Sequence, residues 1–288
     1  MTDSRQRHLL CFGFGYCAKY LAEILLEQGF RVSGTHRNMM DCENDRNLGI
    51  TSYIFDQDLP IENMWDINTV THILISIPPQ NSQDIVLKEH LADLKKMPKL
   101  EWVGYLSTTG VYGDKQGDWV DENSVCSPTT ERTIARLNAE KEWLGTDLPV
   151  NIFRLSGIYG PNNSIIEQLK NGTAKRINKP GQFFSRIHVA DIANTLIASM
   201  NKNTKNEIFN IADDYPCSQE EVVAYAAQLL NLPAPPLVDF KDAELSEMAK
   251  SFYAQNRQVK NDKIKNELGV ELLYPSYKEG LFDLVNKI

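Results

Sequence analysis

The sequence contains few cysteines, and they are not arranged to bind a metal or to form a redox pair. The five cysteines lie between Cys11 and Cys217 and include no Cys-x-x-Cys motif. An odd number of scattered cysteines indicates reduced thiols in a cytosolic protein, because a secreted framework pairs its cysteines. We therefore expect a cytoplasmic protein without a metal site.

The sequence also lacks the basic excess and the long apolar runs that some partners require. Lys and Arg number 30 against 38 Asp and Glu, for a net charge of -8. Nucleic-acid binding needs clustered positive charge, so we expect no nucleic-acid partner. No apolar run reaches the length of a membrane span, and the first residues, MTDSRQRHLLCF, contain no signal-peptide core. A soluble protein with a small-molecule substrate is the expectation.

Short apolar runs alternate with helical patterns, which is typical of β-α-β units that build a parallel sheet. One such unit is complete, because a helical stripe over Ala18–Gln28 ends at Gly29. The expected strands are apolar throughout, as strands covered on both faces are, and comprise His8–Phe12, Arg31–Thr35, Tyr53–Phe55, His72–Ile75, Trp102–Ser107 and Asn151–Leu155. The pattern predicts an α/β fold with a Rossmann-type doubly wound parallel sheet.

The pattern loosens beyond Tyr159, where glycines and prolines interrupt it. A chain of 288 residues is long enough for a cofactor domain with an added smaller lobe. We expect an NAD(P)-binding domain over residues 1–160, with 186–212 returning to it. Residues 161–185 and 213–288 are expected to form a smaller C-terminal substrate lobe.

The first expected strand runs directly into a glycine-rich loop that opens the first helix. Its sequence, Gly13-Phe14-Gly15-Tyr16-Cys17-Ala18, fits the Gly-x-Gly-x-x-Gly/Ala fingerprint of dinucleotide-binding proteins. Gly13 would allow the tight turn, Gly15 would let a pyrophosphate approach the backbone, and Ala18 would permit close helix packing. The free N–H groups of the helix N-terminus would bind the phosphates. A plain tight turn is the alternative.

The residues after the second expected strand favour NADP over NAD. The sequence Gly34-Thr35-His36-Arg37 has no acidic residue to bind both ribose hydroxyls, and Arg37 can pair with a 2'-phosphate, although it could also be a solvated surface residue. Asp56, with Asp58 as the competing candidate, could accept a hydrogen bond from the adenine amino group, or could only cap a turn. The remaining candidate cofactor contacts are Ser76, Ile77 and Ser107.

Four later segments resemble the extended short-chain dehydrogenase/reductase superfamily, which includes NAD(P)-dependent sugar-nucleotide epimerases and dehydratases. The segments occur in the family order and read LSTTGVYG at Leu106–Gly113, FRLSGIYGP at Phe153–Pro161, RIHVAD at Arg186–Asp191 and EIFNIA at Glu207–Ala212. Phe12 stands where extended members usually carry a further glycine. That departure is similar to the pattern of the atypical members, so the resemblance implies an oxidoreductase or epimerase/dehydratase-like protein.

The resemblance also implies a catalytic Tyr-x-x-x-Lys pair, but the sequence departs from it. Aligned on Pro128 and Glu140, the tyrosine and lysine positions carry Arg132 and Arg136, and no tyrosine lies between Tyr112 and Tyr159. Arginine stays protonated near neutral pH, so it can orient or neutralise a group but cannot exchange a proton. We expect altered or weak chemistry, or none.

Two interpretations of these arginines remain open. They could share a solvated helix face opposite a stripe of Ile134, Leu137 and Leu144, with Arg136 paired to Glu140 one turn later. Alternatively, they could clamp a carboxylate or phosphate, since arginine forks bind such anions in bidentate geometry.

Other site residues follow from the resemblance. Thr108 holds the position of the hydroxyl that bonds a substrate oxygen, and Tyr112 is a candidate substrate contact. Arg186 would meet a substrate phosphate, unless it forms a salt bridge with Asp191. Substitute proton donors, by residue type, are Tyr112, Tyr159, His188 and Cys126.

The resemblance also implies that helical faces around Lys88–Leu94 and Thr133–Leu144 could form the two-helix homodimer contact that the superfamily commonly uses. Two functions remain: an enzyme that acts on a small anionic or sugar-nucleotide substrate, or a non-catalytic NADP-binding redox sensor or regulator.

Overall fold

The computed structural model describes residues 6–46, 48–61 and 68–287. Residues 1–5, part of the first stretch considered above, lie outside these ranges. The chain forms two compact units. The first comprises Met1–Thr108, Thr130–Arg154 and Leu196–Phe209, and the second comprises Thr109–Thr129, Leu155–Thr195 and Asn210–Ile288. These units are defined by packing, so the domain boundaries expected at residues 160, 186 and 212 stay predictions.

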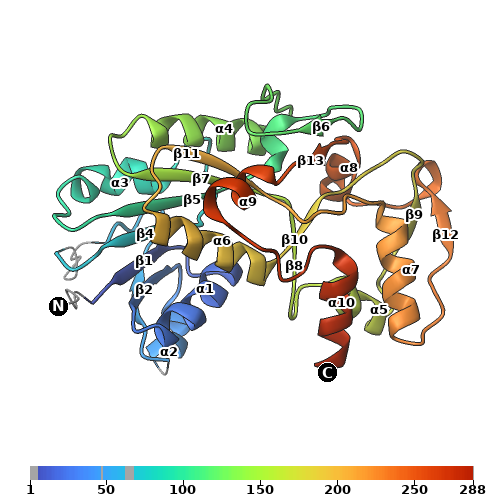
Figure 1. The fold of residues 1–288 in the computed structure, drawn as a ribbon, viewed down its shortest axis with the longest axis horizontal. Helices are drawn as coiled ribbons and strands as arrows, with labels where there is room; N and C mark the ends of the chain where they lie inside the picture. Colours follow the sequence, from blue (N-terminus) through green and yellow to red (C-terminus); the bar gives the residue numbers. More distant parts are fainter. Residues whose placement is uncertain (1–5, 47, 62–67, 288) are drawn as a thin grey trace. The chain divides into compact units, whose positions relative to one another are not determined.

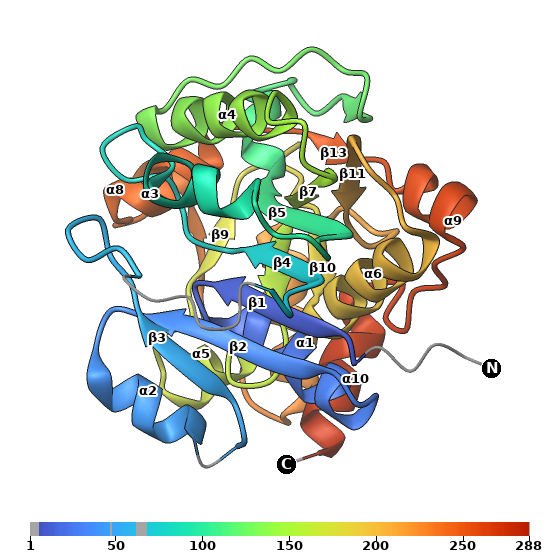
Figure 2. The ribbon, with the colours of Figure 1, turned by 90° about the vertical axis from the view of Figure 1, so that its left-hand side faces the viewer.

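A seven-stranded sheet runs through the first unit in the order β11-β7-β5-β4-β1-β2-β3, and Figure 2 shows the strands lying side by side between helices. Its pairs β1–β2, β1–β4, β2–β3 and β4–β5 are parallel. The strands are β1 (His8–Phe12), β2 (Arg31–His36), β3 (Thr51–Ile54), β4 (His72–Ile75), β5 (Trp102–Thr108), β7 (Val150–Leu155) and β11 (Glu207–Ile211). All six expected strands are present, and the predicted doubly wound α/β class is confirmed.

Helices cover both faces of this sheet (Figure 1). On one face α3 (Ile85–Leu94) and α4 (Glu131–Leu144) pack against Leu10, Phe12, Ile73 and Tyr105. Asp84 joins the two helices, because it caps the N-terminus of α3 and its other oxygen accepts a 3.0 Å hydrogen bond from the Trp143 indole. The opposite face carries α1 (Tyr16–Glu27), and α2 (Met39–Arg46) follows β2.

The buried face of α4 differs from the expected stripe. Ile134 is 43% exposed, so the interpretation of Ile134, Leu137 and Leu144 as the core-facing stripe is wrong. The buried residues are mostly small or polar and comprise Thr133, Ala135, Ala139, Glu140 and Trp143. Small side chains let the helix backbone approach β5 closely, and Trp143 then fills the space at the end of the helix.

The second unit contains short paired strands and a separate helical core (Figure 1). Its parallel strand pairs are β8 (Gly157–Tyr159) with β10 (Arg186–His188), β9 (Arg176–Asn178) with β12 (Leu237–Asp239), and β6 (Trp119–Val120) with β13 (Gln258–Val259). Its helices are η1 (Thr109–Tyr112), α5 (Ile165–Lys170), the first part of α6 (Val189–Lys202), α7 (Gln219–Leu229), η2 (Phe240–Asp242), α8 (Glu247–Tyr253), α9 (Asp262–Leu268) and α10 (Tyr277–Asn286).

The core of the second unit forms where three of its helices meet. Ile166 of α5, Val223 of α7 and Leu281 of α10 are fully or almost fully buried in one cluster. Within the described ranges, no helix is both long and apolar enough to cross a membrane.

Candidate functional site

The first unit places several candidate residues at one edge of its sheet. β1 pairs with both β2 and β4, so the strand order reverses at β1. The loop Gly13–Gly15 follows β1, and Ser76 and Ile77 follow β4. In doubly wound folds ligands bind at such a reversal point, beyond the carboxyl ends of the strands.

The turn after β1 requires glycine at position 13. Gly13 has φ +85°, and a Cβ there would lie 2.7 Å from Ile77 Cγ1 and 2.8 Å from Ser76 Oγ. The Ser76 hydroxyl donates to the Gly13 carbonyl over 2.5 Å. Ser76 and Ile77 therefore pack directly against the loop and leave no space for a side chain at position 13.

Thr35 at the end of β2 also holds this loop, although sequence reasoning did not identify it as a site residue. The Gly13 N–H donates to Thr35 Oγ1 at 2.8 Å, and the Phe14 N–H donates to the Thr35 carbonyl at 2.9 Å. These two bonds fix the loop against the neighbouring strand.

Gly15 and the start of α1 have the open backbone that a phosphate needs. A Cβ at Gly15 would meet no atom within 4 Å, and no side chain caps the helix N-terminus. Ala18 is fully buried, which brings α1 close to the sheet. The uncapped N–H groups at the helix start, with the positive end of its dipole, fit the pyrophosphate of a dinucleotide.

The side chains of the loop serve packing. Phe14 is buried against Gly34, where a Cβ would lie 2.6 Å from the Phe14 ring. Burial raises the pKa of the Cys17 thiol to about 11, so it stays protonated at neutral pH. Tyr16 is half-buried beside them.

The end of β2 carries a cation, and its nearby carboxylate is already engaged. Arg37 is exposed and makes no hydrogen bond to a described residue. Asp45 is buried and bonds both His36 Nε2 at 2.5 Å and the Ser52 hydroxyl at 2.8 Å. Beyond β3, Asp56 accepts a 2.9 Å bond from the Gln57 N–H, as the turn-capping alternative expects.

The two arginines of α4 differ in environment. Arg132 is exposed, whereas Arg136 is half-buried and donates through NH1 to the Leu106 carbonyl at 2.7 Å and to the Tyr105 hydroxyl at 3.2 Å. The guanidinium also lies over the Tyr105 ring, 5.5 Å from its centroid. Its Nε and NH2 donate to no described residue.

The alternative ion pair between Arg136 and Glu140 does not form. Glu140 instead pairs with Arg154 at 2.7 Å and accepts a 2.5 Å bond from the Ser107 hydroxyl, all within the first unit. Ser107 is therefore a buried member of this network, and Thr108 follows it, half-buried, at the end of β5. The sequence motifs contained Ser107 and Arg154 but gave no sign that they share a partner.

The candidate residues of the second unit are engaged within that unit. Tyr112 is fully buried and donates to Asn210 Oδ1 at 2.7 Å. Arg186 is buried and donates to the Phe184 carbonyl at 2.9 Å and to Gln219 Oε1 at 3.0 Å. The alternative salt bridge from Arg186 to Asp191 is absent, because Asp191 accepts the N–H groups of Leu273 and Tyr274 at 2.7 and 3.1 Å.

The substitute proton donors are constrained as well. The Tyr159 hydroxyl donates to the Ser276 carbonyl at 3.2 Å, and burial raises its pKa. Burial lowers the pKa of His188 to about 4, so its imidazole is neutral at physiological pH. Cys126 is half-buried, with its thiol 4.0 Å from the Ser124 carbonyl.

No protein-family profile and no curated protein matches the chain. Among solved structures, a conserved protein of unknown function from Silicibacter pomeroyi DSS is 44% identical, with a TM-score of 0.90 over 98% of this chain and 99% of that one. The dTDP-glucose 4,6-dehydratase of Bacillus anthracis, solved with NAD, is 18% identical, with a TM-score of 0.78 over 97% and 96% of the two chains.

The human epimerase family protein SDR39U1, solved with NADPH, is 14% identical, with a TM-score of 0.73 over 98% of this chain and 100% of that one. The matches that are 18% and 14% identical show only that the fold is shared, whereas the 44% identity extends over nearly the whole sequence. The chain belongs to the same family as the Silicibacter pomeroyi protein, and it has the fold of the NAD(P)-dependent epimerase/dehydratase proteins of the extended short-chain dehydrogenase/reductase superfamily, as its motifs predicted.

Proposed function

We propose that the first unit binds NADP(H) across the carboxyl ends of β1, β2 and β4. The observation that carries this proposal is the open backbone at Gly15, directly before an uncapped helix N-terminus. Gly13, Ser76 and Ile77 form the base of the loop, so the backbone geometry exists before a ligand arrives. A preformed site loses less conformational entropy on binding than one that must be ordered.

The preference for NADP rests on Arg37. It follows β2, is exposed and has no protein partner among the described residues, while the nearby Asp45 is buried and engaged by His36 and Ser52. A guanidinium pairs with a 2'-phosphate, whereas a ribose diol would call for a carboxylate at this edge. Fold relatives have been solved with NAD or with NADPH, so the fold itself is compatible with either dinucleotide.

The reaction we propose is that of an oxidoreductase or epimerase/dehydratase-like enzyme without the usual tyrosine and lysine. A bound nicotinamide would donate or accept hydride. Arg136 is anchored by NH1 to the Leu106 carbonyl, at the end of β5, and its remaining donors with the exposed Arg132 would hold a carboxylate or phosphate of a small anionic or sugar-nucleotide substrate. Thr108, two residues beyond Leu106, would bond a substrate oxygen.

A second candidate function is a non-catalytic NADP-binding sensor or regulator. It is favoured by the state of the residues that could replace the missing acid. The Tyr112 and Tyr159 hydroxyls are engaged by Asn210 and Ser276, and His188 is buried and neutral. In that case, dinucleotide binding would report the redox state to a partner without turnover.

The cofactor proposal is tested by titrating the protein with NADPH and NADH while following nicotinamide fluorescence. We expect tighter binding of NADPH and a loss of roughly ten- to hundredfold in that affinity for Arg37→Ala, since a charged hydrogen bond is removed. Arg46→Ala is the matched control, because Arg46 is also exposed and lies at the end of α2. Equal NADPH and NADH affinities in wild type and Arg37→Ala would overturn the NADP assignment.

A second experiment separates the enzyme from the sensor. NADPH carrying deuterium at C4 of the nicotinamide is incubated with the protein and a dTDP-glucose derivative that carries a ketone at C4 of the sugar, and deuterium delivered to that carbon is measured by mass spectrometry. If Arg132→Ala and Arg136→Ala reduce this transfer while NADPH still binds, the result supports the two arginines as a clamp for a substrate carboxylate or phosphate. Transfer unchanged in both variants contradicts the clamp, and tight NADPH binding with no transfer to this sugar favours the sensor.

A further inference from the structure

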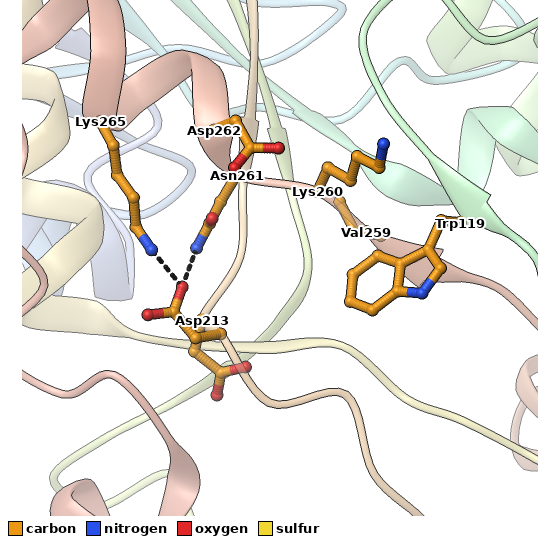
Figure 3. Close-up of a pocket in the computed structure, with 8 residues that line it drawn as sticks. Trp119, Asp213, Val259, Lys260, Asn261, Asp262 and Lys265 are labelled. Atoms are coloured by element: carbon orange, nitrogen blue, oxygen red, sulfur yellow. Dashed lines mark hydrogen bonds and ion pairs between the residues drawn. The ribbon is translucent and has the colours of Figure 1, made fainter.

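The second unit contains a pocket of about 300 Å³ that none of the candidate site residues lines (Figure 3). Its walls come from β6, β13, the start of α9 and the two residues after Ala212. The lining residues are Trp119, Asp213, Asp214, Val259, Lys260, Asn261, Asp262 and Lys265. The volume lies at the lower end of the range for ligand sites, so the pocket fits one ring-sized compound rather than a dinucleotide.

The walls of the pocket are fixed by hydrogen bonds. The Lys260 N–H donates to the Val120 carbonyl at 2.9 Å, and the Gln258 N–H donates to the Asp118 carbonyl at 3.0 Å, which joins β13 to β6. On the other side, the Asn261 amide donates to the Ala212 carbonyl at 2.9 Å. The arrangement therefore needs little ordering when a ligand enters.

An aromatic face forms part of the rim. Trp119 is 49% exposed, whereas Trp102 and Trp143 are fully buried. Figure 3 shows the indole next to Val259, so the two side chains present a shared apolar surface, and Lys260 follows Val259 in the lining. A tryptophan ring that remains half-exposed in a pocket offers a flat apolar surface to a ligand ring.

The lysines of the pocket are balanced by carboxylates. Lys265 and Asn261 both donate to Asp214 Oδ1, at 2.5 and 2.6 Å, the two dashed bonds of Figure 3. The hydrogen bond from the Ser124 hydroxyl, and to a smaller extent the charge of Lys260, lower the pKa of the neighbouring Asp121, and Asp262 is exposed at the rim. The pocket therefore has no net excess of one sign that would select a strongly charged ligand.

The floor has an unsatisfied polar atom. Asp213 is 1% exposed; its Oδ1 accepts the Tyr215 N–H at 3.1 Å, but Oδ2 has no hydrogen-bond partner. Burial raises the pKa of Asp213 to about 7, so a good part of the population is uncharged near neutral pH. In the described part of the chain, no group of three or more carboxylate, imidazole or thiol side chains is placed to hold a metal ion.

We propose that this pocket binds the ring of a neutral, hydroxyl-bearing compound, of the class of a monosaccharide, with one ring face on Trp119. Hydroxyl groups both donate and accept hydrogen bonds, which matches a lining that mixes carboxylates, an amide and ammonium groups. The apolar face of a sugar ring matches the indole and Val259. None of the lining residues is among those proposed to hold the dinucleotide, so binding here is tested independently of the function proposed above.

The test compares three sugars of one ring size that differ in charge: D-glucose, D-glucuronate and D-glucosamine. Binding to the full chain is measured by saturation-transfer NMR of the ring protons and by calorimetry. We expect saturable binding of D-glucose, at least as tight as that of the two charged sugars. Tighter binding of either charged sugar overturns the proposal. So does a lack of saturation by D-glucose up to about 50 mM, a Kd that corresponds to a binding free energy of only roughly 2 kcal/mol.

Variants locate the bound sugar. Trp119→Ala should lower D-glucose affinity by roughly three- to tenfold, the range of an aromatic contact, and Trp119→Phe should retain most of it. Phe282→Ala is the matched control, because Phe282 is a 55% exposed aromatic residue of the same unit outside the pocket. Thermal unfolding of each variant verifies folding. Binding that survives in Trp119→Ala, or that is equally lost in Phe282→Ala, contradicts this site.

Discussion

Arg154 binds Glu140 through two guanidinium nitrogens inside the first unit. Its NH2 lies 2.7 Å from Glu140 Oε2, and its Nε lies 3.2 Å from both carboxylate oxygens. The two side chains are only 5% and 2% exposed, and the Ser107 hydroxyl occupies the remaining acceptor position. This network joins β7, α4 and β5, and it leaves Arg136 to bond the backbone of β5 instead.

Glu140→Gln should lower the free energy of unfolding by about 3 kcal/mol, because it leaves the Arg154 charge buried without its counterion. Urea unfolding followed by circular dichroism measures the change. Glu142→Gln is the control, since Glu142 lies on the exposed side of the same helix, and it should change stability by less than about 0.5 kcal/mol. Similar losses in both variants would mean that the buried pair contributes nothing specific.

Arg136→Ala should cost about 2 kcal/mol of stability, because it removes the charged donor that satisfies the Leu106 carbonyl. Arg132→Ala should leave stability within about 0.5 kcal/mol of wild type, since Arg132 is exposed. Chemical unfolding of both variants gives the comparison. If the exposed position proved the more destabilising, the anchoring role of Arg136 would be wrong.

Gly13→Ala should lower both stability and NADPH binding, whereas Gly15→Ala should lower NADPH binding alone. At Gly13 the positive φ and the contact with Ile77 make any side chain strained, so stability should fall by about 1–3 kcal/mol, with loss of NADPH binding. At Gly15 the φ of -91° is ordinary and the space is empty, so stability should hold while NADPH affinity falls about tenfold or more. Unchanged affinity in Gly15→Ala would argue against a pyrophosphate at this loop.

Asp213→Asn should change how stability depends on pH. The pKa of Asp213 is raised from 3.8 to about 7 by burial, so the folded state retains a proton that the unfolded state releases. The stabilisation that the Asp213 carboxyl contributes to the folded state is fully present below pH 3.8 and is lost as the pH rises to about 7. From pH 4 to pH 7.5 wild type should therefore lose roughly 2–4 kcal/mol relative to Asp213→Asn.

Urea unfolding at several pH values checks this difference, and other buried acids such as Asp191 contribute equally to both proteins. Parallel stability curves for the two proteins would show that Asp213 ionises normally in the folded state.

The positions of the strands along the chain could be predicted from the sequence because they depend on local patterns. The expected limits of β1 and β4 coincide with the observed His8–Phe12 and His72–Ile75, since uninterrupted apolar runs mark strands covered on both faces. Gly29 lies just after the end of α1 and has φ +81°, a conformation that glycine adopts without a steric penalty. The glycine-rich loop Gly13–Gly15 could be predicted for the same reason, since it is a local turn between a strand and a helix.

The partners of individual polar side chains could not be predicted in this way. The interpretation in which Arg136 pairs with Glu140, one of two left open, used the spacing of one helical turn, but Arg154 of β7 supplies a bidentate partner for that carboxylate. Likewise, Ile134 suggested an apolar stripe, yet the surface of α4 that meets the sheet is built from small residues. Thr35 bonds the glycine-rich loop only because β2 lies beside β1.

The sequence by itself determined the α/β class, the order of the strands along the chain and the glycine loop, because hydrophobic periodicity and backbone sterics act over a few residues. Only the tertiary structure decided which charges are buried and paired, which hydroxyls are engaged, and where Trp119 and Asp213 meet in a pocket. Those outcomes depend on contacts between residues far apart in sequence, where burial makes the geometry of each partner decisive.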